Sequence, residues 1–157
     1  MKLSTNSPFI TRAKPGDTGQ IAPLFDAYRQ FYRQPPNLPG ARRFISDRLR
    51  AKQSVVLVAW VKSAGAPKAV GFVQLYPTFS SVSMKPLWIL NDLYVAPEAR
   101  KQGVAKTLME GAWQLAFSTG AKEIILETAK DNFPAQKLYK QVGYKRDEEF
   151  HRYALTV

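Results

Sequence analysis

The sequence predicts a single α/β domain in which a mixed β-sheet is flanked by helices. Segments rich in β-branched and aromatic residues alternate with segments whose apolar residues recur every three or four positions. The chain has 157 residues, which is the length of one domain, and no repeat, linker or low-complexity tract divides it. We therefore expect residues 1–157 to form one domain with one core.

The first half of the chain is expected to contain two helices and a hairpin. Asp17 is a suitable N-cap, and the apolar residues after it recur at helical spacing until Pro35. Residues 44–49 supply the apolar face of a second helix. Residues 54–61 and 69–76 are strand-like runs separated by a Ser-Ala-Gly-Ala-Pro turn, which is typical of an antiparallel hairpin.

The second half is expected to contain a strand, a glycine-terminated helix, a short strand, a helix capped by an asparagine, and one or two last strands. Their expected bounds are residues 87–95, 104–120, 123–128, 132–142 and 144–157.

Composition excludes several classes of function. The chain has no cysteine, which excludes disulfides, thiol nucleophiles and thiolate metal sites. The one histidine, His151, cannot build a histidine-rich centre, so we predict no metal. No run of about 18 apolar residues could cross a membrane, and the polar residues 1–8 lack the apolar core of a signal peptide. We therefore expect a cytoplasmic protein.

The net charge of +11 raises the question of a nucleic-acid partner. However, the basic residues are dispersed from Lys2 to Arg152, and no helix-turn-helix, zinc-finger or RNA-recognition motif accompanies them. A generally basic surface that attracts an anionic cofactor explains the charge, so we predict no specific nucleic-acid partner.

The loop after the strand at residues 87–95 has the features of a phosphate site. A helix start leaves backbone N–H groups unpaired and carries partial positive charge. Gly103 and Ala105 add little bulk there, and Arg100, Lys101 and Lys106 add charge. No Gly-Lys-Ser/Thr follows, which disfavours nucleoside triphosphates, and the third glycine of a dinucleotide site is absent. Another pyrophosphate or an ordinary solvated turn remains open.

Two motifs resemble those of the GCN5-related N-acetyltransferases (GNAT). Arg100-x-x-Gly103-x-Ala105, after Leu-Tyr-Val-Ala-Pro, is similar to that family's acetyl-CoA loop, Arg/Gln-x-x-Gly-x-Gly/Ala. Residues 132–144 match its Asn-x-x-Ala-x-x-Leu-Tyr-x-x-x-Gly-Phe/Tyr segment. The expected order of helices and strands is also that of the family fold.

The resemblance implies that acetyl-CoA is the cosubstrate. In the family, the strand before the loop splays from its neighbour, and its main chain contacts the pantetheine arm. By the same resemblance, Asn132 would contact this arm. The implied cofactor-binding residues are Leu93, Tyr94, Val95, Arg100, Lys101, Gln102, Gly103, Val104, Ala105, Lys106, Asn132 and Tyr139.

Tyr139 is the candidate general acid for the departing thiolate. It follows Asn132 by seven residues, about two helical turns, so both side chains lie on one side of the helix. Phenols ordinarily titrate near pH 10 and so carry a proton at neutral pH. The alternative is a half-buried packing tyrosine.

Asp92 and Glu127 are the candidate catalytic carboxylates, because both interrupt otherwise apolar strand segments. Asn91-Asp92 resembles the Glu-Asp pair of polyamine and diamine acetyltransferases, with the residue that matches their base replaced by Asn91. We favour Asp92 as substrate anchor or base, with Glu127 as the alternative base. A water relay, or a salt bridge to a lysine or arginine, also remains open.

The expected activity is direct transfer of an acetyl group from acetyl-CoA to a primary amine of a small molecule, either an amine, a diamine or an amino acid. With no cysteine to form an acyl-enzyme, the reaction would proceed in a ternary complex. Loops at residues 28–36 and 76–85 are expected to select the acceptor, and their segments 31–35 and 79–84 resemble those of bacterial relatives of small yeast acetyltransferases for histones, polyamines or D-amino acids. The alternatives are a protein, histone or polyamine acetyltransferase, and a catalytically weak acyl-CoA-binding module. The resemblance also implies a homodimer.

Overall fold

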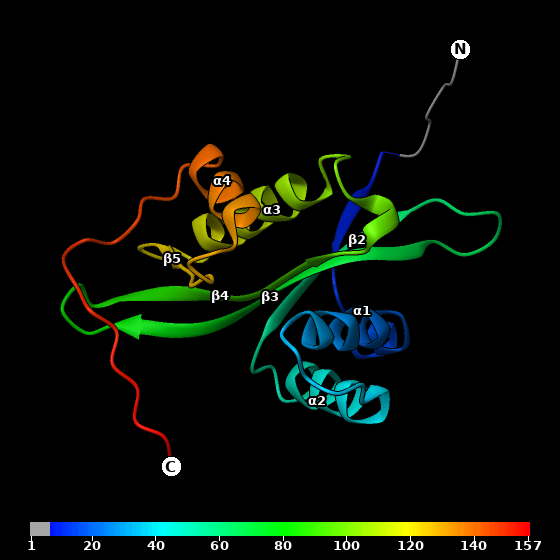
Figure 1. Cartoon of the computed structure of the whole chain (residues 1–157), viewed down its shortest axis with the longest axis horizontal. Helices are drawn as coiled ribbons and strands as arrows, with labels where there is room; N and C mark the ends of the chain where they lie inside the picture. Colours follow the sequence, from blue (N-terminus) through cyan, green and yellow to red (C-terminus); the bar gives the residue numbers. More distant parts are fainter. Residues whose placement is uncertain (1–6) are drawn as a thin grey trace. The chain divides into compact units, whose positions relative to one another are not determined.

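The computed structural model describes residues 7–157, so most of the polar N-terminal segment, residues 1–6, lies outside it. Five strands form one sheet in the order β1-β2-β3-β4-β5 (Figure 1). The first four strands pair antiparallel, and β5 pairs parallel with β4. The predicted mixed α/β class is therefore confirmed. The strands are β1 (Phe9–Arg12), β2 (Val55–Val61), β3 (Lys68–Ser80), β4 (Lys85–Val95) and β5 (Ile124–Ile125).

The chain divides into two compact units, one that ends at Glu127 and one that comprises Thr128–Val157. The first unit contains the sheet, three α-helices and two short 3-10 turns. The helices are α1 (Thr18–Phe31), α2 (Leu38–Arg50) and α3 (Val104–Ser118), and the turns are η1 (Pro15–Asp17) and η2 (Pro97–Ala99). The second unit contains α4 (Phe133–Gln141).

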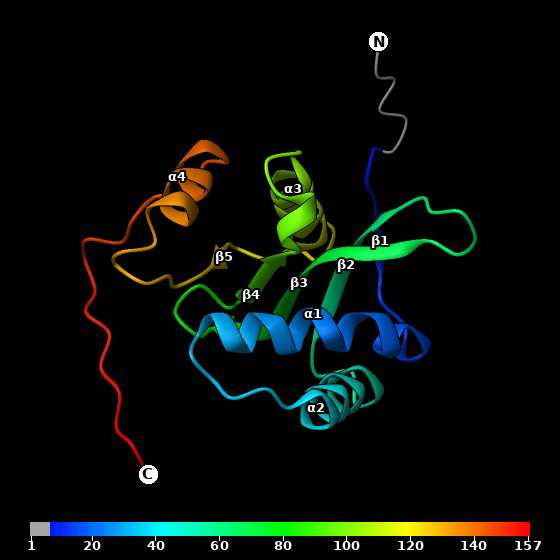
Figure 2. The same ribbon diagram turned by 45° about the vertical axis from the view of Figure 1, so that its right-hand side comes forward.

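Helices cover both faces of the sheet in the first unit. Figures 1 and 2 show α1 and α2 together on one face and α3 on the other. Ile21, Phe25 and Ile45 from α1 and α2 pack with Val56, Val58 and Phe72 of the strands. Because both faces are covered, β2 is buried along nearly its whole length and reads as a continuous apolar run.

Gly71 sets how closely α3 approaches the sheet. A Cβ at this position would lie 3.0 Å from the carbonyl oxygen of Tyr94 and 3.3 Å from Val104 Cγ1. The start of α3 therefore packs directly on β3 beside the end of β4. This contact fixes the loop that joins β4 to α3.

An irregularity in β4 lies close to this loop. Gln74 of β3 is opposite Asp92, and the next β3 residue, Leu75, is opposite Leu90, so Asn91 is an extra residue in β4. On its other side, β4 pairs with β5 only at Trp88 and Ile89, although it continues to Val95. The pairing of the two strands thus stops just before the bulge.

The structure corrects several predicted boundaries. β1 was not predicted; it is four residues long and mostly exposed, so it lacks a clear apolar pattern. β3 runs to Ser80, further than expected, and β5 covers two residues instead of six.

The predicted strand or strands over residues 144–157 are wrong, because the structure has neither helix nor strand there. Five consecutive charged residues, 145–149, open this segment. Asp147 Oδ1 accepts hydrogen bonds from the backbone N–H groups of Glu149 and Phe150, at 2.8 and 3.3 Å. Such a local turn withdraws these N–H groups from a strand ladder.

Candidate active site

The loop that joins β4 to α3 has the backbone that a helix-start site requires. Lys101 and Gly103 have positive φ values of 59° and 80°. Gly103 is the N-cap of α3 and has no side chain that could accept from the first N–H groups of the helix. A Cβ on Gly103 would meet no heavy atom within 4 Å, so the loop is open at this residue. No acidic residue lies in the first turn of α3.

Side chains of the loop hold its shape. Arg100 Nε donates to the carbonyl oxygen of Val95 at 2.9 Å, and its guanidinium lies 5.6 Å from the ring centre of Tyr94. Gln102 Nε2 donates to the carbonyl oxygen of Glu98 at 2.9 Å. Arg100 therefore ties the loop back to the end of β4, a role the sequence does not reveal.

Three lysines lie around the loop, and two of them pair with glutamates. Lys106 lies 3.9 Å from Glu110 in an exposed pair on α3, and Lys68 pairs with Glu98 at 3.1 Å. The lysine and a backbone hydrogen bond lower the pKa of Glu98, with the backbone bond the larger cause. Lys101 is exposed at the loop itself.

On the face of the sheet opposite to α3, Asp92 belongs to a buried row of polar side chains. Ser54 Oγ donates to Gln74 Oε1 at 2.9 Å, and Gln74 Nε2 donates to Asp92 Oδ2 at 2.7 Å. The exposed fractions are 6% for Ser54, 0% for Gln74 and 4% for Asp92. Because every member has a partner, the row is tolerated between two apolar layers.

The other oxygen of Asp92 is also bonded. Asn91 Nδ2 donates to Asp92 Oδ1 at 3.1 Å, and the Tyr28 hydroxyl donates to the Asn91 carbonyl oxygen at 3.2 Å. Burial raises the pKa of Asp92, while hydrogen bonds from Gln74, Asn91 and Tyr28 lower it in part. A carboxylate whose pKa is raised by burial is suited to accept a proton.

Two further residues belong to the surroundings of Asp92. Tyr76 follows Gln74 by two positions on β3 and therefore lies on the same face of the sheet. Burial and the negative charge of Asp92 raise the pKa of Tyr76 to about 12, and Arg48 of α2 acts in the opposite direction.

Sequence reasoning missed Gln74 and Arg48. The available signals were a glutamine inside the apolar run of β3 and an arginine three residues after Ile45 on the apolar stripe of α2.

Glu127 has a different environment. It lies two residues after β5 and is exposed, so the expectation that it interrupts a buried strand is wrong. Of the two candidate carboxylates, only Asp92 is buried.

The second unit places Asn132 and Tyr139 on one helix, as predicted. Asn132 is the N-cap of α4, and its Oδ1 accepts from the backbone N–H of Ala135 at 3.3 Å. The ring of Tyr139 lies 5.9 Å from that of Tyr144. Burial raises the pKa of Tyr144 to about 12, and Tyr139 adds to the rise.

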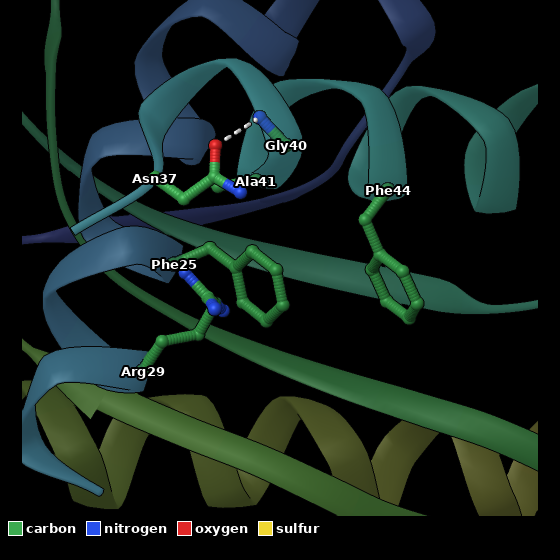
Figure 3. Close-up of a pocket in the computed structure, with 6 residues that line it drawn as sticks. All are labelled: Phe25, Arg29, Asn37, Gly40, Ala41 and Phe44. Carbon is green, nitrogen blue, oxygen red and sulfur yellow. Dashed lines mark hydrogen bonds between the residues drawn. The ribbon is translucent and has the colours of Figure 1, made fainter. Parts of the chain in front are cut away.

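A pocket of about 300 Å³ lies between α1 and α2 (Figure 3). Phe25 and Phe44 line it with rings 5.5 Å apart. Its polar groups already have partners: Arg29 donates to Asp26 at 3.0 Å, and Asn37 Oδ1 accepts from the N–H of Gly40 at 2.9 Å. We assign this pocket to the packing of the two helices.

Within residues 7–157, no group of three or more His, Asp and Glu side chains gathers as a metal site. No helix in the same residues is long and apolar enough to span a membrane.

Comparison with known proteins gives consistent matches. The model of the acetyltransferase (GNAT) family matches residues 21–144. A Bacillus subtilis (strain 168) protein, uncharacterized N-acetyltransferase YhfO, is 47% identical over 148 residues, which cover 94% of this chain and 97% of that protein. D-amino-acid N-acetyltransferase HPA3 of Saccharomyces cerevisiae is 32% identical over 84 residues, covering 54% of this chain and 52% of that protein.

Solved structures share the fold. The crystal structure of a probable acetyltransferase has a TM-score of 0.88 and 42% identity, covering 95% of this chain and 97% of its own. An aminoglycoside N-acetyltransferase in complex with CoA has a TM-score of 0.79 and 18% identity over the full length of both chains.

Proposed function

This chain belongs to the acetyltransferase (GNAT) family and is an N-acetyltransferase; we propose that it transfers the acetyl group of acetyl-CoA directly to a primary amine of a small molecule. The proposed acceptors are amines, diamines or amino acids. The observation that carries this proposal is the buried Asp92 at the bulge of β4, with 4% of its surface exposed. A carboxylate so enclosed suits a compact amine better than a side chain on a folded protein.

The features proposed to hold acetyl-CoA lie in the β4 edge and the loop that follows it. The open start of α3 at Gly103, with Lys101 beside it, suits a pyrophosphate. The part of β4 from Leu93 to Val95 continues beyond its pairing with β5, which suits main-chain contacts to the amides of pantetheine. A structural relative in complex with CoA supports this cosubstrate.

The proposed chemistry requires three proton transfers. The acceptor enters as an ammonium ion, and the Asp92 carboxylate takes one of its protons or anchors it while water does so. The amine nitrogen then attacks the thioester carbonyl carbon, a C–N bond forms, and the C–S bond breaks. The departing thiolate takes a proton from the Tyr139 hydroxyl, and the resulting phenolate is reprotonated, through water, by the second proton that the nitrogen loses, which gives free CoA and the neutral acetylated amine.

The test measures CoA release from acetyl-CoA with small amines, diamines, amino acids, polyamines and a histone peptide. Asp92→Asn should lower kcat/KM for the best acceptor by roughly 10²-fold, the usual effect of a general base. Glu127→Gln tests the alternative base, and Asp47→Asn, an exposed carboxylate on α2, is the matched control. Both should retain activity within about twofold of wild type.

Three outcomes would overturn parts of this proposal. A histone peptide as the best acceptor would exclude a small-molecule substrate. Unchanged activity in Asp92→Asn with a loss in Glu127→Gln would move the base to Glu127. Acetyl-CoA binding without turnover of any acceptor would favour the acyl-CoA-binding alternative.

A further inference from the structure

We propose that Arg48 binds a carboxylate of the acceptor, so that the preferred acceptor is an amino acid and not a simple amine. This inference rests on the proposed function, because it takes Asp92 as the group that receives the amine.

Arg48 occupies an unusual place on α2. The helix buries Ala41 and Ile45, and Arg48 continues this stripe, where a charged side chain is unusual. Its guanidinium lies 4.8 Å from the ring centre of Phe44, and its Nε atom is buried without a hydrogen-bond partner. A buried donor without a partner costs free energy, so a bound acceptor atom would stabilise it.

In the part of the chain that the structure describes, no carboxylate lies within ion-pair distance of this guanidinium. Among the ion pairs of residues 7–157, none includes Arg48. By contrast, Arg29 on α1 is held by Asp26 at 3.0 Å. Of these two arginines on the paired helices, Arg48 is therefore the one available to an external anion.

Arg48 and Asp92 both act electrostatically on the same side chain, Tyr76. Tyr76 lies next along its face of β3 from Gln74, and Gln74 donates to Asp92. The pKa of Tyr76 responds to both charges, rising with Asp92 and falling with Arg48. Asp92 and Arg48 do not form an ion pair with each other, so a negative and a positive group both act on one phenol without direct contact between them.

A zwitterion matches this pattern of charge. Its ammonium group would lie at Asp92 and its carboxylate at Arg48, whose planar donors fit two carboxylate oxygens. The Tyr76 hydroxyl, with a pKa of about 12, keeps its proton at neutral pH and is a further donor for the carboxylate. The net charge of +11 also favours an acceptor with an acidic group over a polycation.

The first experiment uses the wild-type protein and pairs of acceptors that differ only in the carboxylate, such as phenylalanine and phenethylamine, or alanine and ethylamine. We expect kcat/KM to be at least about tenfold higher for the amino acid, because the matched amine lacks the charged contact between the carboxylate and Arg48. A series of α-, β- and γ-amino acids then reports the spacing between the two charges. Equal kcat/KM values within every pair would overturn the proposal without any variant.

The second experiment assigns the preference to Arg48. Arg48→Gln should raise KM for amino acids about tenfold or more and change kcat/KM for the matched amines less than about twofold. The KM of Arg48→Lys for amino acids should lie between those of wild type and Arg48→Gln, because lysine keeps the positive charge but lacks the planar donors of arginine. Arg43→Gln removes the same charge from an exposed position on α2 and should leave the preference intact.

The outcomes separate this inference from the proposed function. Turnover of amines and amino acids without discrimination would refute the role of Arg48 and leave the transferase activity standing. Turnover of neither would refute the proposed acceptor class. A preference for amino acids that persists in a folded Arg48→Gln variant, checked by circular dichroism, would also refute the role of Arg48.

Discussion

At the scale of single residues, Asp92 shows how a fold sustains a buried carboxylate. Its two oxygens accept from Gln74 and Asn91 at 2.7 and 3.1 Å, and Gln74 is itself held by Ser54. These bonds offset only part of the cost of burial, because the pKa of Asp92 remains raised. If Asp92 is the proposed base, the fold trades stability for reactivity at this residue, as is common at functional sites.

This trade can be measured as the dependence of stability on pH. The native state holds the Asp92 proton more tightly than the unfolded state, so wild type loses stability as the pH rises from 3.8 through the raised native pKa. Asp92→Asn removes that cost and should raise Tm at neutral pH, where about 1 kcal/mol corresponds to ~2–4 °C for a chain of this length.

Thermal melts from pH 4 to pH 8 would test this expectation, and the gain in Tm should shrink toward pH 4. Asp47→Asn, exposed on α2, should show no such gain. A lower Tm for Asp92→Asn at every pH would mean that the carboxylate stabilises the fold.

Tyr139 carries a separate prediction. If its hydroxyl protonates the departing thiolate, Tyr139→Phe should lower kcat by roughly 10²-fold and leave the Kd of acetyl-CoA nearly unchanged. Stopped-flow or steady-state measurement of CoA release gives kcat, and calorimetry gives Kd. Tyr144→Phe is the control, because its ring packs 5.9 Å from that of Tyr139. Near wild-type turnover in Tyr139→Phe would reduce Tyr139 to a packing role.

At the scale of secondary-structure elements, the start of α3 combines an open backbone with local positive charge. Gly103 has a φ of 80°, which glycine adopts at little cost, and Gly71 allows the helix to lie close to β3. Both glycines therefore serve the position and shape of one loop.

Two substitutions of Gly103 separate the effect of backbone strain from the effects of added bulk and negative charge on acetyl-CoA binding. Gly103→Ala adds a Cβ that meets nothing within 4 Å, so it should cost about 1 kcal/mol in backbone strain and leave acetyl-CoA binding within a few-fold of wild type. Gly103→Glu adds bulk and negative charge and should abolish binding measured by calorimetry. Undiminished binding by Gly103→Glu, with an unchanged circular dichroism spectrum, would place the cosubstrate elsewhere.

Strong local patterns made most elements predictable. The β2–β3 hairpin, the helices and the Asn132 cap follow from apolar periodicity and capping residues near in sequence. β1 is short and mostly exposed, so it depends on pairing with β2, whose paired residues lie 45 positions (from Arg12 to Leu57) or more away. The last five residues, Tyr-Ala-Leu-Thr-Val, are a mostly apolar run, yet no strand forms there, because strand formation requires a partner as well as a favourable composition.

The sequence predicts candidate site residues where a family motif or an isolated charge marks them. The Arg100–Ala105 loop and Asn132 with Tyr139 carry such motifs. Asp92 stood out as a charge among apolar residues, but its partners Ser54 and Gln74 lie on other strands or their approaches. Side chains that meet only through strand register, or from α2 across to β3 like Arg48, leave no contiguous signal in the sequence.

At the scale of the whole molecule, charge is the dominant global property. The chain carries a net charge of +11, with 23 basic and 12 acidic residues. Such a field attracts anions and repels polycations within about 10 Å at 0.1 M salt. It therefore favours the phosphates of acetyl-CoA and disfavours basic peptides as acceptors. The homodimer implied by the resemblance stays a prediction, which sedimentation equilibrium would test.

The last prediction concerns this field and the cosubstrate. Between about 0.02 and 0.5 M salt, the KM for acetyl-CoA should rise by roughly tenfold, because added salt screens attraction to its phosphates. The KM for an uncharged or zwitterionic acceptor should change less than about twofold, since its net charge is near zero. Lys101→Gln should raise the KM for acetyl-CoA and weaken its salt dependence, because Lys101 lies in the loop itself. Arg43→Gln, on the helix that covers the opposite face of the sheet, should do neither. A KM for acetyl-CoA that is flat with salt, or equal effects of the two substitutions, would show that the net charge does not guide the cosubstrate to the start of α3.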